Sequence, residues 1–128
     1  MAQILMDGSN ILFWHANLAQ PDVVVRVAQA LTARRFVPVV YFDHSIARYM
    51  EIAAHLDVAQ TVVAPQGTPA DALLLEACQN GRIQIVSNDR FADWQQDHPR
   101  LRADWRVTGR IGKGGKVSFS KKLKPAPP

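Results

Sequence analysis

The sequence predicts an α/β protein: a three-layer α/β/α sandwich with a mostly parallel sheet, followed by a C-terminal β-hairpin. Two observations lead to this fold class. Short apolar runs alternate with segments of helical periodicity, and a glycine-rich turn later joins two alternating segments. The length of 128 residues suits one domain with a single core. We expect this domain to cover residues 1–120, and the basic, proline-rich residues 121–128 to form a disordered tail.

Each strand is predicted from an apolar run bounded by turn residues. The runs are "AQILM" (2–6), "FVPVVYF" (36–42), "QTVVA" (60–64) and "IQIVS" (83–87). Within the second run, Pro38 requires an early or edge position because proline cannot donate a hydrogen bond to the ladder. The hairpin is predicted from "WRVTGRI", "GKGG" and "KVSFS", residues 105–120.

Each helix is predicted from apolar side chains at helical spacing. These segments are residues 21–35, 45–56, 68–80 and, as a short helix, 89–96. Pro21 suits a first-turn position, and Ser45 and Thr68 are expected N-caps. Pro69 would follow the second of these caps as the first helical residue.

The acids of this chain follow the predicted strands. Asp7 and Asp89 end the first and fourth strands, and Asp71 lies in the first turn of the helix after the third. Because the carboxyl ends of parallel strands meet at one edge of a sheet, these acids should converge there. Asp93 is four residues after Asp89, and so on the same face if a helix forms. Asp43 ends the second strand, but the usual strand order leaves its role open.

Simpler roles are available for each acid taken alone. Asp7 suits a turn with the glycine and polar residues after it, Asp71 a capping box with Thr68, and Asp89 an N-cap. Asp71, however, shares one helix face with Leu74 and Cys78, so it should point toward the sheet.

Considered together, the acids indicate a metal site. Carboxylates crowded on one rim repel each other, which raises their pKa values unless a cation neutralises them. Mg²⁺ and Mn²⁺ prefer oxygen ligands, often few carboxylates with water and substrate phosphates. We therefore expect Mg²⁺ or Mn²⁺ at this rim, with the side-chain amide of Asn10 nearby.

The charge distribution indicates a polyanionic partner. Residues 1–81 carry four basic and seven acidic side chains, a net −3, whereas residues 82–128 carry eleven and four, a net +7. An acidic metal pocket beside a basic hairpin suits phosphodiester hydrolysis, with the basic side chains on flanking phosphates. The expected substrate-binding residues include Trp14, Arg110, Lys113 and Lys116, with Trp14 as a platform for base stacking.

Other classes are disfavoured. The single cysteine, Cys78, excludes a disulfide framework and a cysteine zinc site, and the four histidines show no ligand spacing. The N-terminus does not resemble a secretory signal, and no apolar run approaches the ~20 residues that span a bilayer. We expect a soluble cytoplasmic protein without a membrane partner; self-association into a homodimer stays open.

Several motifs together resemble a known family. "DGSN" after the first strand, Asp71 in the third helix, "VSNDRFADW" at the fourth strand and the closing "RVTGRIGKGGKVSF" resemble the PIN-like NYN ribonucleases. The order is most similar to the nuclease domain of the regnase-type CCCH zinc-finger ribonucleases, over residues 3–119.

The resemblance implies a metal-dependent endoribonuclease that cuts single-stranded RNA. It implies that Asp7, Asp71, Asp89 and Asp93 form the Mg²⁺ site, supported by Asn10, with Ser9 near the metal waters or the substrate. The chain departs from the family in three ways. Asp71 stands without a paired acid, no zinc finger is present, and "APQGTP" before Asp71 lacks basic residues, for which Arg90 is a candidate replacement.

Two alternatives come from other classes. A phosphatase of the haloacid dehalogenase type also has an acid after its first strand, but its chemistry needs a second acid at the position of Ser9. A catalytically silent RNA-binding module, or a subunit of an RNA-processing complex, would keep the fold and the basic hairpin. A complete set of four acids favours the enzyme, and a toxin of a toxin–antitoxin pair would share its chemistry.

Overall fold

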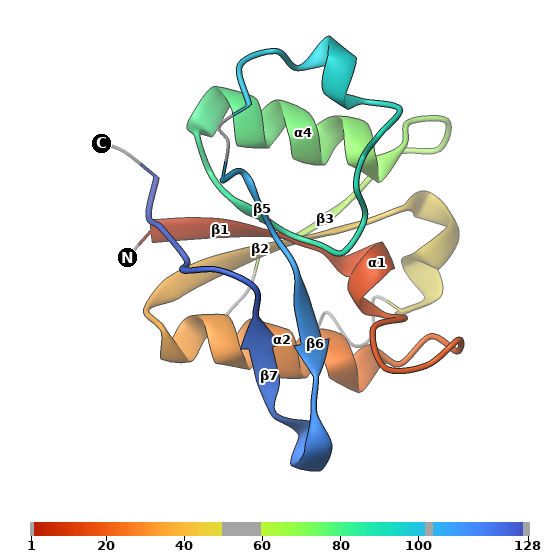
Figure 1. Ribbon diagram of the computed structural model, residues 1–128. Helices are drawn as coiled ribbons and strands as arrows, with labels where there is room; N and C mark the ends of the chain where they lie inside the picture. Colours follow the sequence, from red (N-terminus) through yellow and green to blue (C-terminus); the bar gives the residue numbers. More distant parts are fainter. Residues whose placement is uncertain (1, 50–59, 102–103, 127–128) are drawn as a thin grey trace.

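A five-stranded parallel sheet forms the centre of the molecule, with the strand order β3–β2–β1–β4–β5 (Figure 1). The computed structural model describes residues 2–49, 60–101 and 104–126. The strands are β1 (Ala2–Asp7), β2 (Phe36–Phe42), β3 (Gln60–Val63), β4 (Ile85–Val86) and β5 (Arg106–Val107). Pro38 is placed early in β2: it lies opposite Ile4 of β1, and the described pairing with β3 begins only at Val39.

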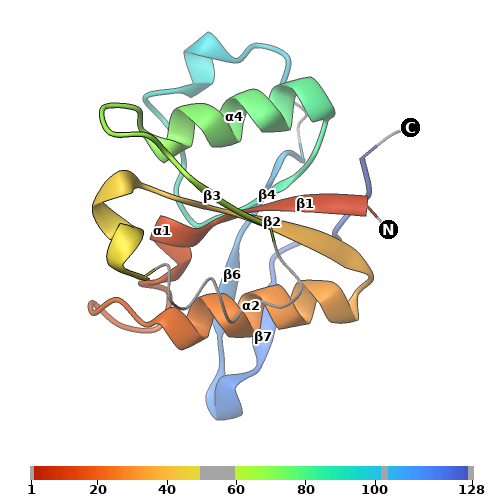
Figure 2. The same ribbon diagram turned by 180° about the vertical axis from the view of Figure 1, so that it is seen from behind.

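Helices cover both faces of this sheet (Figures 1 and 2). The α-helices are α1 (Gly8–Ile11), α2 (Pro21–Ala33) and α4 (Ala70–Gly81), and 3-10 helices are η1 (His44–Tyr49), η2 (Gln95–Asp97) and η3 (Lys113–Gly115). Alternate side chains of β1 serve the two faces: Ile4 and Met6 pack in the core beneath α2, whereas Leu5 packs in the core beneath α4. The predicted three-layer fold class is confirmed.

The start of α4 differs from the prediction. The helix begins at Ala70, with Pro69 in the N-cap position and no capping hydrogen bond from its own segment. Thr68 lies one residue too early to cap the helix, because the Pro69 backbone is still extended, with a ψ of 139°. The acceptor comes instead from Asp43, whose Oδ1 accepts the backbone N–H of Ala70 at 2.8 Å.

The predicted helix over residues 89–96 is wrong in its first part. The Asp89 carboxylate accepts the backbone N–H of Phe91 at 2.9 Å, and Phe91 has a positive φ of 54°, which a right-handed helix cannot contain. Only Gln95–Asp97 form a helical turn. Asp89 and Asp93 therefore do not share a helix face.

The predicted helix over residues 45–56 lies partly outside the described residues. Its described beginning is the 3-10 helix η1, which starts at His44. Ser45 therefore lies inside this helix and is not its N-cap.

The C-terminal hairpin is confirmed, with one change. Strand β6 (Gly109–Ile111) pairs antiparallel with β7 (Val117–Phe119), and Val117 packs in the core on the α2 side. The first residues of the predicted hairpin, Arg106 and Val107, instead form β5 and pair parallel with β4 at the edge of the main sheet.

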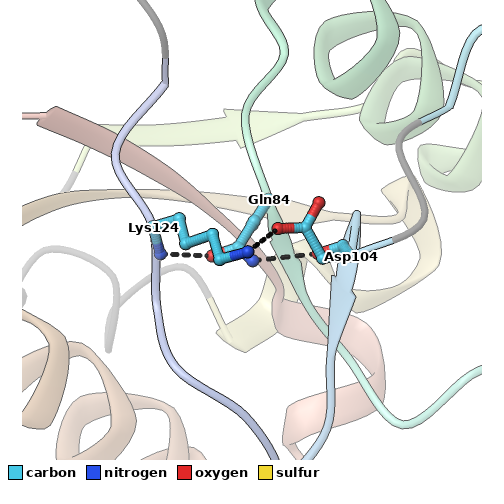
Figure 3. A network of polar contacts seen from close by, with 3 residues as sticks. All are labelled: Gln84, Asp104 and Lys124. Carbon is cyan, nitrogen blue, oxygen red and sulfur yellow. Dashed lines mark hydrogen bonds and ion pairs between the residues drawn. The ribbon is translucent and has the colours of Figure 1, made fainter.

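The segment after β7 contacts the sheet through a polar network (Figure 3). The buried Gln84 accepts the backbone N–H of Lys124 at 2.8 Å and donates to the backbone oxygen of Asp104 at 2.9 Å. Lys124 Nζ also lies 3.0 Å from the Asp104 carboxylate, and Leu123 packs against the core. These contacts attach residues 123 and 124, which we expected in a disordered tail, to the sheet edge.

Across the described ranges of the chain, the helices are too short or too polar to cross a bilayer.

Candidate metal centre at the carboxyl edge of the sheet

Three carboxylates from distant parts of the sequence meet at the carboxyl edge of the sheet. They belong to Asp7 at the end of β1, Asp71 in the first turn of α4, and Asp89 in the loop after β4. One oxygen from each lies within 4.8 Å of the other two. The predicted convergence of these acids is therefore observed.

Asp7 is the buried member of this group, with 3% of its surface exposed. Its carboxylate caps α1 by accepting the backbone N–H of Asn10 at 3.4 Å, and it accepts the Ser87 hydroxyl at 2.7 Å. Burial, and to a smaller extent the charges of Asp71 and Asp89, raise the pKa of Asp7 from 3.8 to about 7. Asp7 thus both caps the turn after β1 and belongs to the carboxylate group.

Gly8 allows the chain to turn directly after Asp7. A Cβ atom at this position would lie 2.6 Å from the Phe42 ring and 2.8 Å from the backbone oxygen of Tyr41. No side chain fits here unless β2 moves. The glycine of "DGSN" therefore brings α1 close to the sheet, which keeps Asn10 within reach of the Asp7 carboxylate.

Ser87 is the site residue that the sequence analysis missed. This buried residue donates its hydroxyl to Asp7 and accepts the backbone N–H of Asp89 at 3.0 Å. It therefore links two of the acids and fixes the carboxylate of the buried one. The available signal was its place after the apolar residues of the predicted fourth strand, two positions before Asp89.

Asp71 is half-buried, and its pKa is raised from 3.8 to about 6 by burial, then by the charges of Asp89 and Asp43. A hydrogen bond from the Trp94 side chain acts in the opposite direction on this pKa. The capping-box role with Thr68 is not observed, because Asp43 takes that place. Asp43 thus positions Asp71 by fixing the start of α4.

Asp89 is the exposed member of the group, whereas Asp93 is exposed in the following turn and is not a member. The positive φ of Phe91 separates the two acids, and the buried Phe91 ring anchors this loop by packing against Trp105 at a centroid distance of 5.6 Å.

The side-chain amide oxygen of Asn10 bonds residues that lead to the hairpin, and not the acids. That oxygen accepts the Trp14 indole N–H at 2.8 Å and the backbone N–H of Asn88 at 2.9 Å. The Asn88 amide in turn bonds both the N–H and the carbonyl of Gly109, each at 2.9 Å. A Cβ on Gly109 would lie 2.6 Å from the Trp14 ring, so this indole packs closely on β6.

The other expected substrate-binding residues lie in α1, in the loop after β4 and in the hairpin. Ser9 accepts the backbone N–H of Asp43 at 3.0 Å and so has a structural role. Arg90 is exposed beside Asp89, Arg110 is exposed on β6, and Lys113 and Lys116 are exposed at the hairpin turn. Their roles in substrate binding stay predictions.

The donor set fits a hard divalent cation. Three carboxylates at this spacing supply oxygen ligands, and the pKa values of Asp7 and Asp71 are raised by burial first and by the neighbouring negative charges second. A cation would relieve this repulsion. The residues present are thus suited to Mg²⁺ or Mn²⁺, and they offer no sulfur or imidazole that would favour a softer metal.

Comparisons with known proteins agree with this architecture. The sequence matches no protein-family model and no curated protein. The fold is similar to the crystal structure of nuclear proteinaceous RNase P 2 (PRORP2) from A. thaliana, with a TM-score of 0.65 and 16% identity. The match covers 99% of this chain but only 30% of that protein. At this identity the likeness concerns the fold alone, a parallel α/β sheet with helices on both faces.

Proposed function

We propose that this protein is a metal-dependent endoribonuclease that hydrolyses phosphodiester bonds of single-stranded RNA, with Mg²⁺ or Mn²⁺ as its cofactor. The observation that carries the proposal is the convergence of Asp7, Asp71 and Asp89, whose oxygens lie within 4.8 Å of one another. Three separate elements supply these acids, and their mutual repulsion would be costly without a cation to bind.

The chemistry follows from this donor set. A divalent cation bound by these three acids would polarise a phosphoryl oxygen and lower the pKa of a bound water. The residues of the chain orient the reacting groups. Ser87 and the backbone of Asn10 fix the buried Asp7 carboxylate, while Asp89 is exposed on the side from which a phosphate can approach. Asp71 lies between the interior and solvent, where its carboxylate can accept a hydrogen bond from the attacking water.

Two further observations support RNA as the substrate. The net +7 charge of residues 82–128 is concentrated on the segment that forms β5, the hairpin and the C-terminal segment, and so favours a polyanion. The solved structure to which the fold is similar is named as an RNase. The closer resemblance to the regnase-type branch belongs to this proposal. Asp93 is not proposed as a ligand, because it lies outside the carboxylate group.

A catalytically silent RNA-binding module is the second candidate. One observation favours it: Asp93, the fourth acid of the family pattern, lies outside the carboxylate group.

The test is cleavage of an end-labelled single-stranded RNA with Mg²⁺, with Mn²⁺ and with excess chelator. We expect metal-dependent cutting that Asp89→Asn reduces by at least ~100-fold, since it removes a charged ligand at the reacting centre. Because Asp89 is exposed, this variant should keep the fold. Asp97→Asn, at an exposed acid outside the group, is the matched control and should cut normally. RNA binding without cutting under any metal would instead support the silent module.

A further inference from the structure

A basic surface lies at the amino edge of the sheet, opposite the carboxyl edge that holds the acids. Arg34, at the end of α2, and Lys121 and Lys122, after β7, line a hollow of ≈ 360 Å³ together with Phe36, Phe119 and Leu123. We call this hollow the distal basic groove. All three basic side chains are exposed, and no acid lines the hollow. In Figures 1 and 2 the segment after β7 passes the end of α2 near the N-terminus, away from α1.

The groove is held in place by packing. The Arg34 guanidinium lies 5.0 Å from the centroid of the Phe119 ring and donates to the backbone oxygen of Ala30 at 2.8 Å. Lys121 and Lys122 lie between β7 and the anchored residues Leu123 and Lys124, which are fixed by the core and by the Gln84 network (Figure 3). The cationic groups are thus presented by an ordered segment, which lowers the entropic cost of binding a strand.

This groove adjoins a second hollow that leads toward the acids. The second hollow, also of ≈ 360 Å³, is lined by residues 108–110 and 118–120 of the hairpin, and both hollows share Phe119. Its Gly109 is bonded to Asn88, which is bonded to Asn10 beside Asp7. Arg110 and hydroxyl groups along this path can contact phosphates.

The turn of the hairpin is a less suitable path. The hollow there is lined by Lys113, but also by Asp22 and by Arg26, and these last two are 3.7 Å apart as an ion pair. An acid on that surface opposes a polyanion and reduces the available positive charge.

The sheet sets the separation between the acids and the distal groove. Strand β1 runs from Ala2, opposite Phe36, to Asp7, opposite Tyr41. At ~3.3 Å per residue these ends lie roughly 17 Å apart, about five nucleotides of a stacked strand at ~3.4 Å each.

We propose that single-stranded RNA bound at the acid cluster continues along the hairpin hollow and is held by Arg34, Lys121 and Lys122 in the distal basic groove. This inference rests on the proposed function and adds a length requirement to it. RNA that reaches the groove binds more tightly than RNA that covers only the acids.

The experiment compares Lys121→Gln/Lys122→Gln with Arg82→Gln/Arg100→Gln. The control pair removes the same charge from exposed positions that line a different hollow, at the end of α4. Binding of RNAs of ~20 and ~4 nucleotides is measured against salt in the Asp89→Asn background with Mg²⁺, where cutting is expected to be at least ~100-fold slower. We expect the lysine pair to weaken binding of the long RNA about tenfold and to reduce its salt slope by about 1.4, at ~0.7 per lost phosphate contact. The short RNA and the control pair should change little.

The outcomes separate this inference from the proposed function. Equal losses of RNA affinity in the lysine pair and the control pair, or equal losses for the long and short RNAs, would overturn the distal groove. This holds even if the wild-type protein cuts RNA. A selective loss for the long RNA supports the groove, whether or not the cleavage assay succeeds. Binding of the long RNA that does not respond to the lysine pair, together with binding to acidic peptides that does, would assign the surface to a protein partner and reject the inference.

Discussion

Asp7 shows how one residue serves both the fold and the site. Its carboxylate caps α1, accepts the hydroxyl of Ser87 and faces two other acids. Burial of a carboxylate costs stability whenever the group is ionised, because the charge loses its hydration. A residue chosen only to cap a short helix would not need to be buried among acids. The position of Asp7 therefore agrees with the proposed cation, which would compensate its charge.

The raised pKa of Asp7 predicts an unusual dependence of stability on pH in the metal-free protein. Between its ordinary value of 3.8 and about 7, the folded state holds a proton that the unfolded chain has released. Stability should therefore fall as pH rises through this window, the opposite of the usual behaviour of a paired aspartate. Thermal unfolding with chelator at several pH values measures this. Asp7→Asn should flatten the profile and raise Tm at pH 7 by the order of 5 °C. A wild-type profile that rises between pH 5 and 7 would contradict the prediction.

At the scale of elements, the start of α4 depends on a residue from another strand. Asp43, directly after β2, accepts the N–H of Ala70, while Thr68 in the local sequence does not cap the helix. Asp43 therefore fixes the position of Asp71 relative to the sheet. The helix that carries Asp71, a proposed metal ligand, in its first turn is thus held by the residue that follows the neighbouring strand β2.

This arrangement predicts different effects for two substitutions. Asp43→Ala should lower the free energy of unfolding by about 1 kcal/mol, the usual cost of losing a cap, and should weaken metal binding through Asp71. Asp43→Asn keeps an acceptor oxygen and should retain most of the stability. Thr68→Ala should change stability by less than ~0.5 kcal/mol, because its side chain caps nothing. Urea unfolding measures all three, and a larger loss for Thr68→Ala than for Asp43→Ala would show that the local cap operates in solution.

For the whole molecule, the acid cluster joins three elements that are far apart in sequence. The ends of β1 and β4 and the start of α4 meet only when the sheet has formed and α4 has docked on it. The unfolded chain cannot bring these acids together, so a cation should bind the folded state almost exclusively. Binding of this kind stabilises the fold by mass action.

Addition of Mn²⁺ or Mg²⁺ should therefore stabilise the protein globally. At about ten times the dissociation constant we expect ~1.4 kcal/mol of stabilisation, a rise in Tm of roughly 3–6 °C. The decline in stability between pH 3.8 and about 7 should also disappear, because the cation takes the place of the bound proton. Asp71→Asn should abolish most of the rise, and Glu76→Gln, at an exposed acid of the same helix, should preserve it. Equal stabilisation of both variants would mean that the metal acts elsewhere.

The sequence by itself determined the fold class, the strands β1 to β4 and the convergence of three acids, but not β5, which was expected in the hairpin. Apolar runs and helical spacing depend on burial, and parallel strands must end at one edge, so local pattern was sufficient for Asp7, Asp71 and Asp89. Tertiary structure decided the rest. Ser87 contacts Asp7, and Asp43 caps α4, through hydrogen bonds across the sheet that no local spacing in the sequence encodes. Asp93 does not share a helix face with Asp89. The hydrogen bond from Phe91 to the Asp89 side chain and the packing of Phe91 against Trp105 favour a left-handed turn at Phe91 over a helix.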